Sequence, residues 1–242
     1  VAATFRLASL TGLSSLVERV RRLFDLEVDI EPIADHLRSD AMLASLVDAR
    51  PGLRVAGSWD RFELAVRAVL GQQVTVAAAR RLGGALVECC GRTLSSNEGG
   101  DTALRRSFPD ARAVAAAELE RLPMPRARTR ALRALAEAAM TDPSLFEPLG
   151  SVEQTVARLV AIRGIGEWTA HYIALRASRE PDAFPSNDAA LRRSAGRLDP
   201  GADARRPNAL TERAARWRPW RGYAAQHLWA ADAAHQLSRV AS

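Results

Sequence analysis

The sequence predicts a mainly helical protein with one strand near its start. Nearly half of its 242 residues are apolar, and Ala and Leu dominate over Val, Ile and the aromatic residues, a balance that favours packed helices over sheets. Apolar residues recur at helical spacing in most segments after residue 12. A chain of this length can bury a proper core, as one large domain or two small ones.

The first expected element is a strand at residues 3–9, where apolar and polar residues alternate around Ala3, Phe5 and Leu7. A single strand is not stable by itself. It therefore either pairs with something outside this chain or is a fragment of a larger sheet.

Helices are predicted for the rest by their apolar spacing and by the residues that begin and end them. Ser58 and Thr75 are expected to cap two long helices, and Ser151 with Gln154 forms a capping box. The expected helices cover residues 13–24, 35–49, 58–70, 75–90, 110–122, 126–140, 151–162 and 168–178, a short helix from 188 capped by Ser186-Asn187, and a last helix from 219 through 229, with a polar loop at 91–107.

The charge balance is basic, with a formal net charge of +6, which suits a polyanionic partner such as nucleic acid. On charge alone, a basic protein that binds no nucleic acid is an equally good interpretation. All 34 basic residues are Arg and Lys is absent, which reflects genome composition more plausibly than DNA contacts. The absence of Lys excludes any mechanism that needs a Lys amine, such as Schiff-base chemistry.

Cysteine, histidine and hydropathy patterns exclude further classes. Cys89 and Cys90 are adjacent, so they supply no disulfide framework, iron–sulfur site or zinc knuckle, and we expect them to be small core residues. The four histidines show no metal-ligand spacing, so no protein-ligated transition metal is expected. No apolar run approaches a membrane span and no leader peptide is visible, which indicates a soluble, intracellular protein.

Two features between residues 160 and 188 could carry function. Gly164-Ile165-Gly166 joins two predicted helices, and such a turn can aim bare amides at a phosphate beside a helix N-terminus. A helix corner that needs glycine only for positive φ is the favoured explanation of the glycines alone. Asp188 could stabilise the positive charge that develops when an N-glycosidic bond breaks. Taken alone, it is more often an ordinary capping residue.

Longer motifs decide between these readings. Residues 164–176, G-I-G-E-W-T-A-H-Y-I-A-L-R, resemble the helix-hairpin-helix of the DNA glycosylase superfamily, and most closely the AlkA-type 3-methyladenine DNA glycosylases. D-A-F-P-S-N-D at 182–188 is similar to that family's catalytic loop, and W-R-P-W-R-G-Y-A-A-Q-H-L-W at 217–229 to its C-terminal helix. Upstream, R-R-L-F-D-L, R-P-G-L-R and F-E-L-A-V-R-A-V-L-G-Q-Q-V follow in the family's order, so the resemblance covers nearly all of residues 5–235.

The resemblance implies a helix-hairpin-helix glycosylase fold of two helical subdomains that flank a cleft. Residues 13–242 would form this helical domain, with the hairpin at 151–178 and the catalytic loop at 180–190. Residues 1–12 would contain the last strand of an N-terminal β-rich domain that is otherwise missing. Any pocket or DNA contacts from that domain would lie outside this chain.

The resemblance also implies site residues. Asp188 matches the catalytic aspartate, and Ala189 replaces an aromatic residue sometimes found after it, which would widen the pocket or change its selectivity. Gln73 falls where the family inserts a side chain into the gap left by the flipped nucleotide. The further matches are the base-pocket residues Trp168, Tyr172 and Trp229, the DNA contacts Gly164, Gly166, Thr169 and Gln72, and the backbone carbonyls of Val160, Ile162 and Ile165, which would hold a monovalent cation.

The aromatic residues sharpen the functional prediction. Trp168 and Tyr172 lie one helical turn apart, and with Trp229 they would favour an electron-poor base through a cation–π interaction. Ordinary core packing is the alternative for these three, and we assign Trp217 and Trp220 to the core. Relatives that also nick the backbone resemble this hairpin but carry Lys at the position of Trp168, which predicts base removal without strand cleavage.

The sequence thus predicts a monofunctional glycosylase that excises alkylated purines of the 3-methyladenine and 7-methylguanine type from double-stranded DNA by base flipping. Water would be the nucleophile, and no iron–sulfur cluster is expected. We expect a monomer in the bacterial cytoplasm, associated with the nucleoid and not with membranes. The alternative is a non-catalytic helix-hairpin-helix DNA-binding module of an alkylation-response fusion protein, which has no need of a carboxylate facing the cleft. A lyase-type glycosylase with an iron–sulfur cluster is excluded by the missing Lys and thiols.

Overall fold

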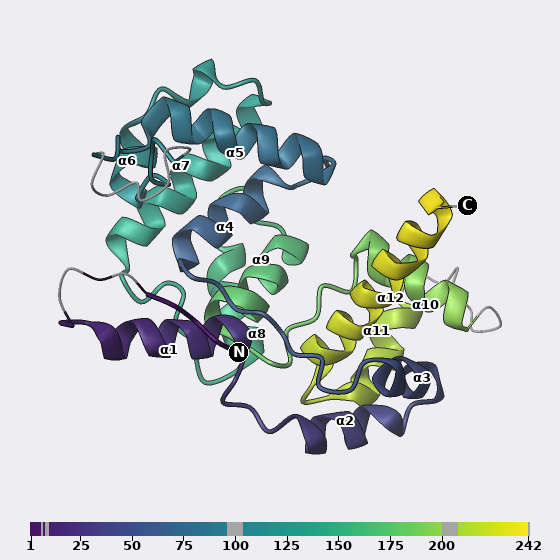
Figure 1. Cartoon of the computed structure of the whole chain (residues 1–242). Coiled ribbons are helices and arrows are strands. Elements are labelled where there is room, and N and C mark those ends of the chain that lie inside the picture. The colour runs from purple at the N-terminus through teal and green to yellow at the C-terminus, as the bar shows by residue number, and fades with distance from the viewer. Residues whose placement is uncertain (6, 8–9, 96–103, 200–207, 242) are drawn as a thin grey trace. The chain divides into compact units, whose positions relative to one another are not determined.

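The computed structural model describes residues 1–5, 7, 10–95, 104–199 and 208–241, which form twelve α-helices (Figure 1). The chain divides into two compact units. The middle unit is residues 60–178, and the terminal unit combines residues 1–59 with residues 179–242. The predicted mainly helical fold class is therefore confirmed.

In the terminal unit, helices from distant parts of the chain pack together. The last helix, α12 (Arg221–Ala241), contacts both α10 (Ala189–Leu198) and α3 (Ala41–Ala49). In turn, α3 contacts α2 (Ile30–Arg38). A short helix, α11 (Ala209–Ala214), precedes α12 and was not predicted from the sequence.

A buried carboxylate, Asp40, divides the helix that was predicted at residues 35–49. It caps α3 by accepting a hydrogen bond from the Met42 amide (2.9 Å), and it also accepts one from the Trp217 indole (2.9 Å) and pairs with Arg213 (2.6 Å). Because this side chain satisfies a free amide at the start of α3, a new helix begins there. Trp217 is 1% exposed, which confirms its assignment to the core, whereas Trp220, assigned to the core with it, is only half-buried.

A second buried carboxylate, Asp25, links the two ends of the terminal unit. Asp25 directly follows α1 (Leu13–Phe24), a helix with the predicted bounds. It accepts a hydrogen bond from the Tyr223 hydroxyl of α12 (2.6 Å) and pairs with Arg179. Burial and the hydrogen bond with Asp25 raise the pKa of the Tyr223 phenol, so its hydroxyl remains a hydrogen-bond donor.

The middle unit is built around α4 (Arg61–Leu70), whose buried face includes Val66, Val69 and Leu70. The N-cap of α4 is Asp60 and not the predicted Ser58. α4 contacts three other helices of the unit, and the remaining two pack on those. These helices are α5 (Val76–Cys90), α7 (Arg126–Thr141) and α9 (Glu167–Ile173), with α6 (Ala111–Ala116) on α7 and α8 (Val152–Val160) on α9.

The turn between α8 and α9 fits closely against α7 because of one glycine. Gly164 has a φ of +88°, and a Cβ built on it would lie 2.5 Å from the Cβ of Ala131 in α7. A side chain there would be strained by its backbone conformation and would also collide with α7. Gly166 differs, because its φ is −84° and a Cβ would meet nothing within 4 Å.

The strand expected at residues 3–9 is not confirmed. Residues 3–5 and 7 have no regular secondary structure, and residues 6, 8 and 9 lie outside the described residues. A strand needs a neighbour to accept and donate its backbone hydrogen bonds, and within the described ranges the one β-type pairing is an isolated bridge between Thr93 and Arg106.

The expectation that both cysteines belong to the core is wrong for Cys89, which is exposed, while Cys90 is half-buried. They occupy the last turn of α5, where successive residues face different sides of the helix. Burial raises the pKa of the Cys90 thiol to about 11. In the part of the chain that the structure describes, no helix is both long enough and apolar enough to span a membrane.

Replacing Gly164 with Ala should lower the free energy of unfolding by about 2–4 kcal/mol, since the added methyl group combines positive-φ strain with overpacking against Ala131. Gly166→Ala is the matched control, and its loss should stay within about 1 kcal/mol. Urea denaturation of both variants measures the difference. Equal losses in the two variants would contradict the close packing of this turn.

Protonation of His227 should make stability depend on pH. Burial in α12 lowers the pKa of this imidazole from 6.5 to about 4, against the opposing effect of a hydrogen bond with the backbone of Leu46. The unfolded chain therefore takes up a proton below pH 6.5, while the folded chain does so only near pH 4. As the pH falls from 7 to 5, His227 should therefore reduce the free energy of unfolding by about 1–2 kcal/mol. His227→Gln should reduce this difference in urea denaturation at the two pH values, and an unchanged difference would refute the assignment.

Candidate functional site

The hairpin that was predicted at residues 151–178 is formed by α8, the turn at 161–166 and α9. Ser151 caps α8 by accepting a hydrogen bond from the Gln154 amide (3.2 Å), as the capping box predicts. Apolar residues on one face of α8 are buried, as is Ile162 just after the helix; those of α8 are Val152, Val156 and Leu159. A π-helical turn, Ala174–Ser178, continues α9.

The exposed glycines of the turn differ in what the fold demands of them. Gly164 is required by its positive φ and by its close packing on Ala131, which supports the interpretation of this residue as a helix-corner glycine. Gly166 caps α9 in an ordinary backbone conformation with open space around it, so packing does not explain its lack of a side chain. The phosphate contacts assigned to these two glycines and to Thr169 remain predictions.

The two neighbouring glutamines, both assigned to DNA, have different surroundings. The Gln72 side-chain amide donates to the Gly164 carbonyl (3.1 Å) and to the Thr169 hydroxyl (2.9 Å), so it holds the hairpin from the α4–α5 turn. Thr169 is buried. Gln73 is exposed and has a φ of 54°. Of the two, Gln73 is the one whose side chain is available for insertion into a duplex.

Trp168 and Tyr172 stack directly on each other; their spacing predicted a shared helix face but not this contact. Their ring centroids are 5.5 Å apart and the planes differ by 13°. A base sandwiched between two rings needs about twice the van der Waals spacing of one stacked pair, so no base fits between these two. The Arg176 guanidinium, from the π-helical turn, lies 5.4 Å from the Tyr172 ring centroid. A base could therefore stack only outside the Trp168–Tyr172 pair, not within it.

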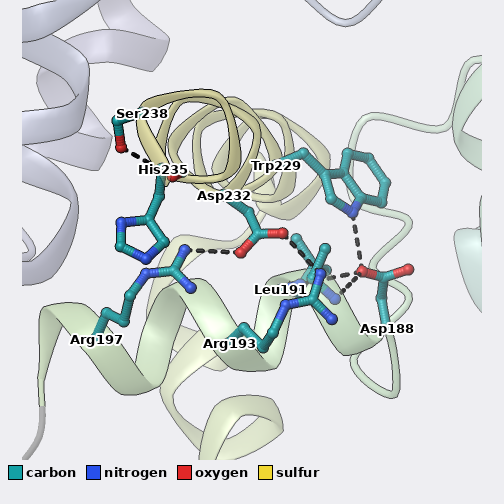
Figure 2. Close-up of polar contacts among 9 residues, drawn as sticks. Asp188, Leu191, Arg193, Arg197, Trp229, Asp232, His235 and Ser238 are labelled. Atoms are coloured by element: carbon teal, nitrogen blue, oxygen red, sulfur yellow. Dashed lines mark hydrogen bonds and ion pairs between the residues drawn. The ribbon is translucent and has the colours of Figure 1, made fainter. Parts of the chain in front are cut away.

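Asp188 is the N-cap of α10, and not Ser186 or Asn187 as expected. Its Oδ1 atom accepts three hydrogen bonds: from the Ala190 amide (2.9 Å), the Leu191 amide (3.0 Å) and the Trp229 indole (3.0 Å). Figure 2 shows the indole of α12 directed at this carboxylate. The half-buried Asp188 is thus both a capping residue and a carboxylate held by a second helix.

The loop before Asp188 is fixed to the start of α12. Arg221 forms two hydrogen bonds with the buried Asp182, Nε to Oδ1 (2.7 Å) and Nη2 to Oδ2 (2.8 Å), and the Gly222 amide donates to the Pro181 carbonyl (2.8 Å). A two-pronged guanidinium–carboxylate contact sets orientation as well as distance. The helix that supplies Trp229 therefore also positions the loop that delivers Asp188.

Further along the same two helices, Asp232 of α12 binds two arginines of α10 (Figure 2). Its Oδ2 lies 2.7 Å from Arg193 and its Oδ1 lies 2.7 Å from Arg197. Burial alone would raise the pKa of Asp232, but the hydrogen bonds from both arginines outweigh it and lower the pKa. Sequence reasoning missed this cluster, although Arg193 and Arg197 stand four residues apart on one helix face.

The carbonyls assigned to a monovalent cation lie at the end of α8 and in the turn. The Ile162 carbonyl accepts a hydrogen bond from the Ile165 amide (3.0 Å), and Val160 is the last residue of α8, where carbonyls lack helical partners. In the residues that the structure describes, no group of three His, Cys, Asp or Glu side chains is placed to hold a metal ion.

Comparison with known proteins gives the chain its family. Residues 1–60 match the family model described as the AlkA N-terminal domain. A probable bifunctional transcriptional activator/DNA repair enzyme AlkA from Mycobacterium tuberculosis is 43% identical over 218 residues, which are 90% of this chain and 42% of that protein. The chain therefore spans less than half the length of this relative. DNA-3-methyladenine glycosylase 2 of Escherichia coli K12 is 37% identical over 214 residues, which are 87% of this chain and 70% of that protein.

Solved structures agree in fold. A 3-methyladenine DNA glycosylase from Archaeoglobus fulgidus superimposes with a TM-score of 0.76 at 22% identity, covering 95% of this chain and 77% of that one. An 8-oxoguanine glycosylase/lyase from Clostridium acetobutylicum in complex with double-stranded DNA superimposes with a TM-score of 0.76 at 18% identity. The match covers 93% of this chain and 76% of that one. These likenesses show that the fold is shared among glycosylases. With the sequence identity to the E. coli protein over most of both lengths, they show that the chain belongs to the AlkA family of DNA-3-methyladenine glycosylases.

Proposed function

We propose that the chain is a DNA glycosylase that excises alkylated purines, such as 3-methyladenine and 7-methylguanine, from double-stranded DNA. The observation that carries the proposal is the Asp188 carboxylate, whose Oδ1 is held by three N–H donors from two helices. The names of the relatives in M. tuberculosis and E. coli support a role in the repair of alkylated bases.

The proposed chemistry needs a fixed negative charge. Breaking the N-glycosidic bond leaves the deoxyribose with oxocarbenium character, and a carboxylate already in place stabilises that charge without reorganisation in the transition state. The two backbone amides and the Trp229 indole hold Asp188 through one oxygen, so the carboxylate cannot rotate away as the charge develops. The cationic base takes the electron pair of the N-glycosidic bond and leaves as a neutral purine, and water then adds to the sugar carbon and loses a proton to the solvent.

Alkylated purines suit such a site because they carry positive charge and leave without a strong general acid. A cationic base stacked on the outside of the Trp168–Tyr172 pair would gain a cation–π interaction. Trp229 remains a proposed pocket residue through the face of its ring, because its N–H is already bonded to Asp188.

DNA would be held mainly through its phosphates. The net charge of +6 favours association with any duplex, and the open space around Gly166 would let a phosphate approach the first amides of α9. A monovalent cation on the carbonyls of Val160, Ile162 and Ile165 would add positive charge beside the same turn. Exposed Gln73 is the proposed wedge in the flipped-base gap. We propose that the protein acts as a monomer, on nucleoid DNA in the cytoplasm.

Asp188→Asn tests the catalytic assignment with little change of shape. The Asn carbonyl oxygen can still accept the three hydrogen bonds that Oδ1 accepts, so the variant removes charge and keeps the contacts. We expect release of methylated purines from alkylated DNA to fall about 100- to 1,000-fold in single-turnover reactions, with binding to abasic DNA retained. Equal release by the two proteins would leave the non-catalytic binding module as the explanation.

The second expectation is base removal without strand cleavage. Strand-nicking glycosylases need an amine to form a Schiff base with the abasic sugar, and this chain has Trp168 at the matching position and no Lys. Incubation of duplex DNA containing one abasic site with the pure protein should give no nicked strand above the buffer control, and alkali should nick the same DNA fully. A borohydride-trapped covalent adduct would refute the prediction.

A further inference from the structure

We propose that Gln72 is a positioning residue that fixes the proposed wedge, Gln73, at a set distance from the hairpin turn. The sequence assigned Gln72 to the DNA contacts, whereas its side chain is bonded to the protein itself. This inference rests on the proposed role of Gln73 as the wedge. It adds to the proposed function the contact that keeps insertion into the duplex and the grip on the phosphates at one fixed spacing.

The side chain of Gln72 connects the α4–α5 turn to the hairpin. Its amide nitrogen donates to the Gly164 carbonyl (3.1 Å) and to the Thr169 hydroxyl (2.9 Å). A side-chain amide nitrogen carries two N–H donors, which matches the two acceptors. One acceptor lies in the hairpin turn and the other in the first turn of α9. Gln72 therefore binds both parts of the proposed phosphate site from behind.

The backbone of Gln72 is held as well, by α7. The Arg128 guanidinium of that helix donates from Nη2 to the Gln72 carbonyl. The same helix packs on the hairpin turn, since a Cβ on Gly164 would lie 2.5 Å from the Cβ of Ala131. The α4–α5 turn, the hairpin turn and α7 therefore contact one another in pairs, all within the middle unit. Supporting contacts of this kind hold a functional side chain in one geometry.

The wedge needs support because Gln73 is exposed and its backbone is strained. Its φ of 54° lies in the left-handed region, which residues other than glycine seldom adopt. Such a conformation persists only where the surrounding structure fixes it. Gln72 is fixed on one side of Gln73, and on the other side Thr75 caps α5 by accepting a hydrogen bond from the Ala78 amide (3.2 Å).

The spacing between wedge and hairpin matters for base flipping. Extruding a nucleotide costs unstacking and unpairing energy, and a side chain offsets that cost only if it reaches the gap while the phosphates are held. A misplacement of about 1 Å can lower a rate about 100-fold. Gln72 precedes the wedge directly in the chain and bonds directly to the hairpin turn, so it sets this spacing.

The first test removes each side of the contact in the full 242-residue chain. Gln72→Ala removes the donor and should lower the single-turnover rate of methylated-purine release about 10- to 100-fold. Thr169→Val removes one acceptor and should lower it about three- to tenfold, because the bond to Gly164 remains. Thr169 is 2% exposed, so loss of its hydroxyl acts through the protein and not through DNA. Thr169→Ser keeps the hydroxyl and should recover most of the rate lost in T169V.

The second test asks whether Gln72 acts through Gln73. Gln73→Ala should lower the release rate and also the fluorescence of 2-aminopurine placed beside the flipped nucleotide, which brightens when its stacking is lost. Adding Q72A to Q73A should then change both readouts less than about twofold, because no wedge remains to be positioned. A direct DNA contact by Gln72, or a general loss of stability, would instead make the two losses multiply.

Other outcomes overturn the proposal. These are an unchanged rate in Q72A or T169V, multiplied losses in the double variant, or a T169S rate as low as that of T169V, which would make packing the cause. If Q73A kept the wild-type rate and fluorescence, the wedge and this inference would both fail, while base release by the wild type would still support the proposed function. If the wild type released no base, the proposed function would fail, and the fluorescence of the same variants on duplex with an abasic site would still decide this inference.

Discussion

The packing of α10 against α12 is the constraint on which the candidate active site depends. One helix begins with Asp188, and the other supplies the indole that bonds it. The same α12 holds the preceding loop through Arg221 and the following turns of α10 through Asp232. Charge-assisted contacts before and after Asp188 leave its backbone little freedom. A carboxylate of this kind can stabilise positive charge without first being reoriented, which is what electrostatic catalysis requires.

Capping residues and apolar spacing predicted many helix boundaries in the terminal unit and the hairpin. They failed where contacts with residues far along the chain determine where a helix begins. The bounds of α1, the Thr75 cap of α5 and the capping box at Ser151 depend on residues within one turn, so the sequence alone indicates them. The break at Asp40 does not, because that carboxylate is held by Arg213 and Trp217, which stand 173 and 177 residues further along the chain. No reading of residues 35–49 alone contains that contact.

In the candidate site too, the sequence indicated some features and only the structure shows others. Family resemblance indicated the residue at 188, and the helical period indicated that Trp168 and Tyr172 share a face. The helical period could not indicate that the two rings stack on each other, which leaves no room for a base between them. Likewise Gln72 and Gln73 have the same chemistry in sequence. Their roles diverge because the chain enters a positive φ at Gln73, so one side chain meets the hairpin and the other is exposed.

The absence of Lys affects the site in two opposite ways. It removes the amine that strand-nicking chemistry needs, and it makes every strongly basic side chain a guanidinium that does not lose its proton. Such a group is not neutralised by burial or by an ordinary pH change, so a guanidinium that packs against the protein needs an opposite charge beside it. Asp182 pairs with Arg218 and Arg221, and Asp232 pairs with Arg193 and Arg197. The pairs of Asp182 with Arg221 and of Asp232 with Arg193 therefore fix the loop before Asp188 and the helix after it to α12.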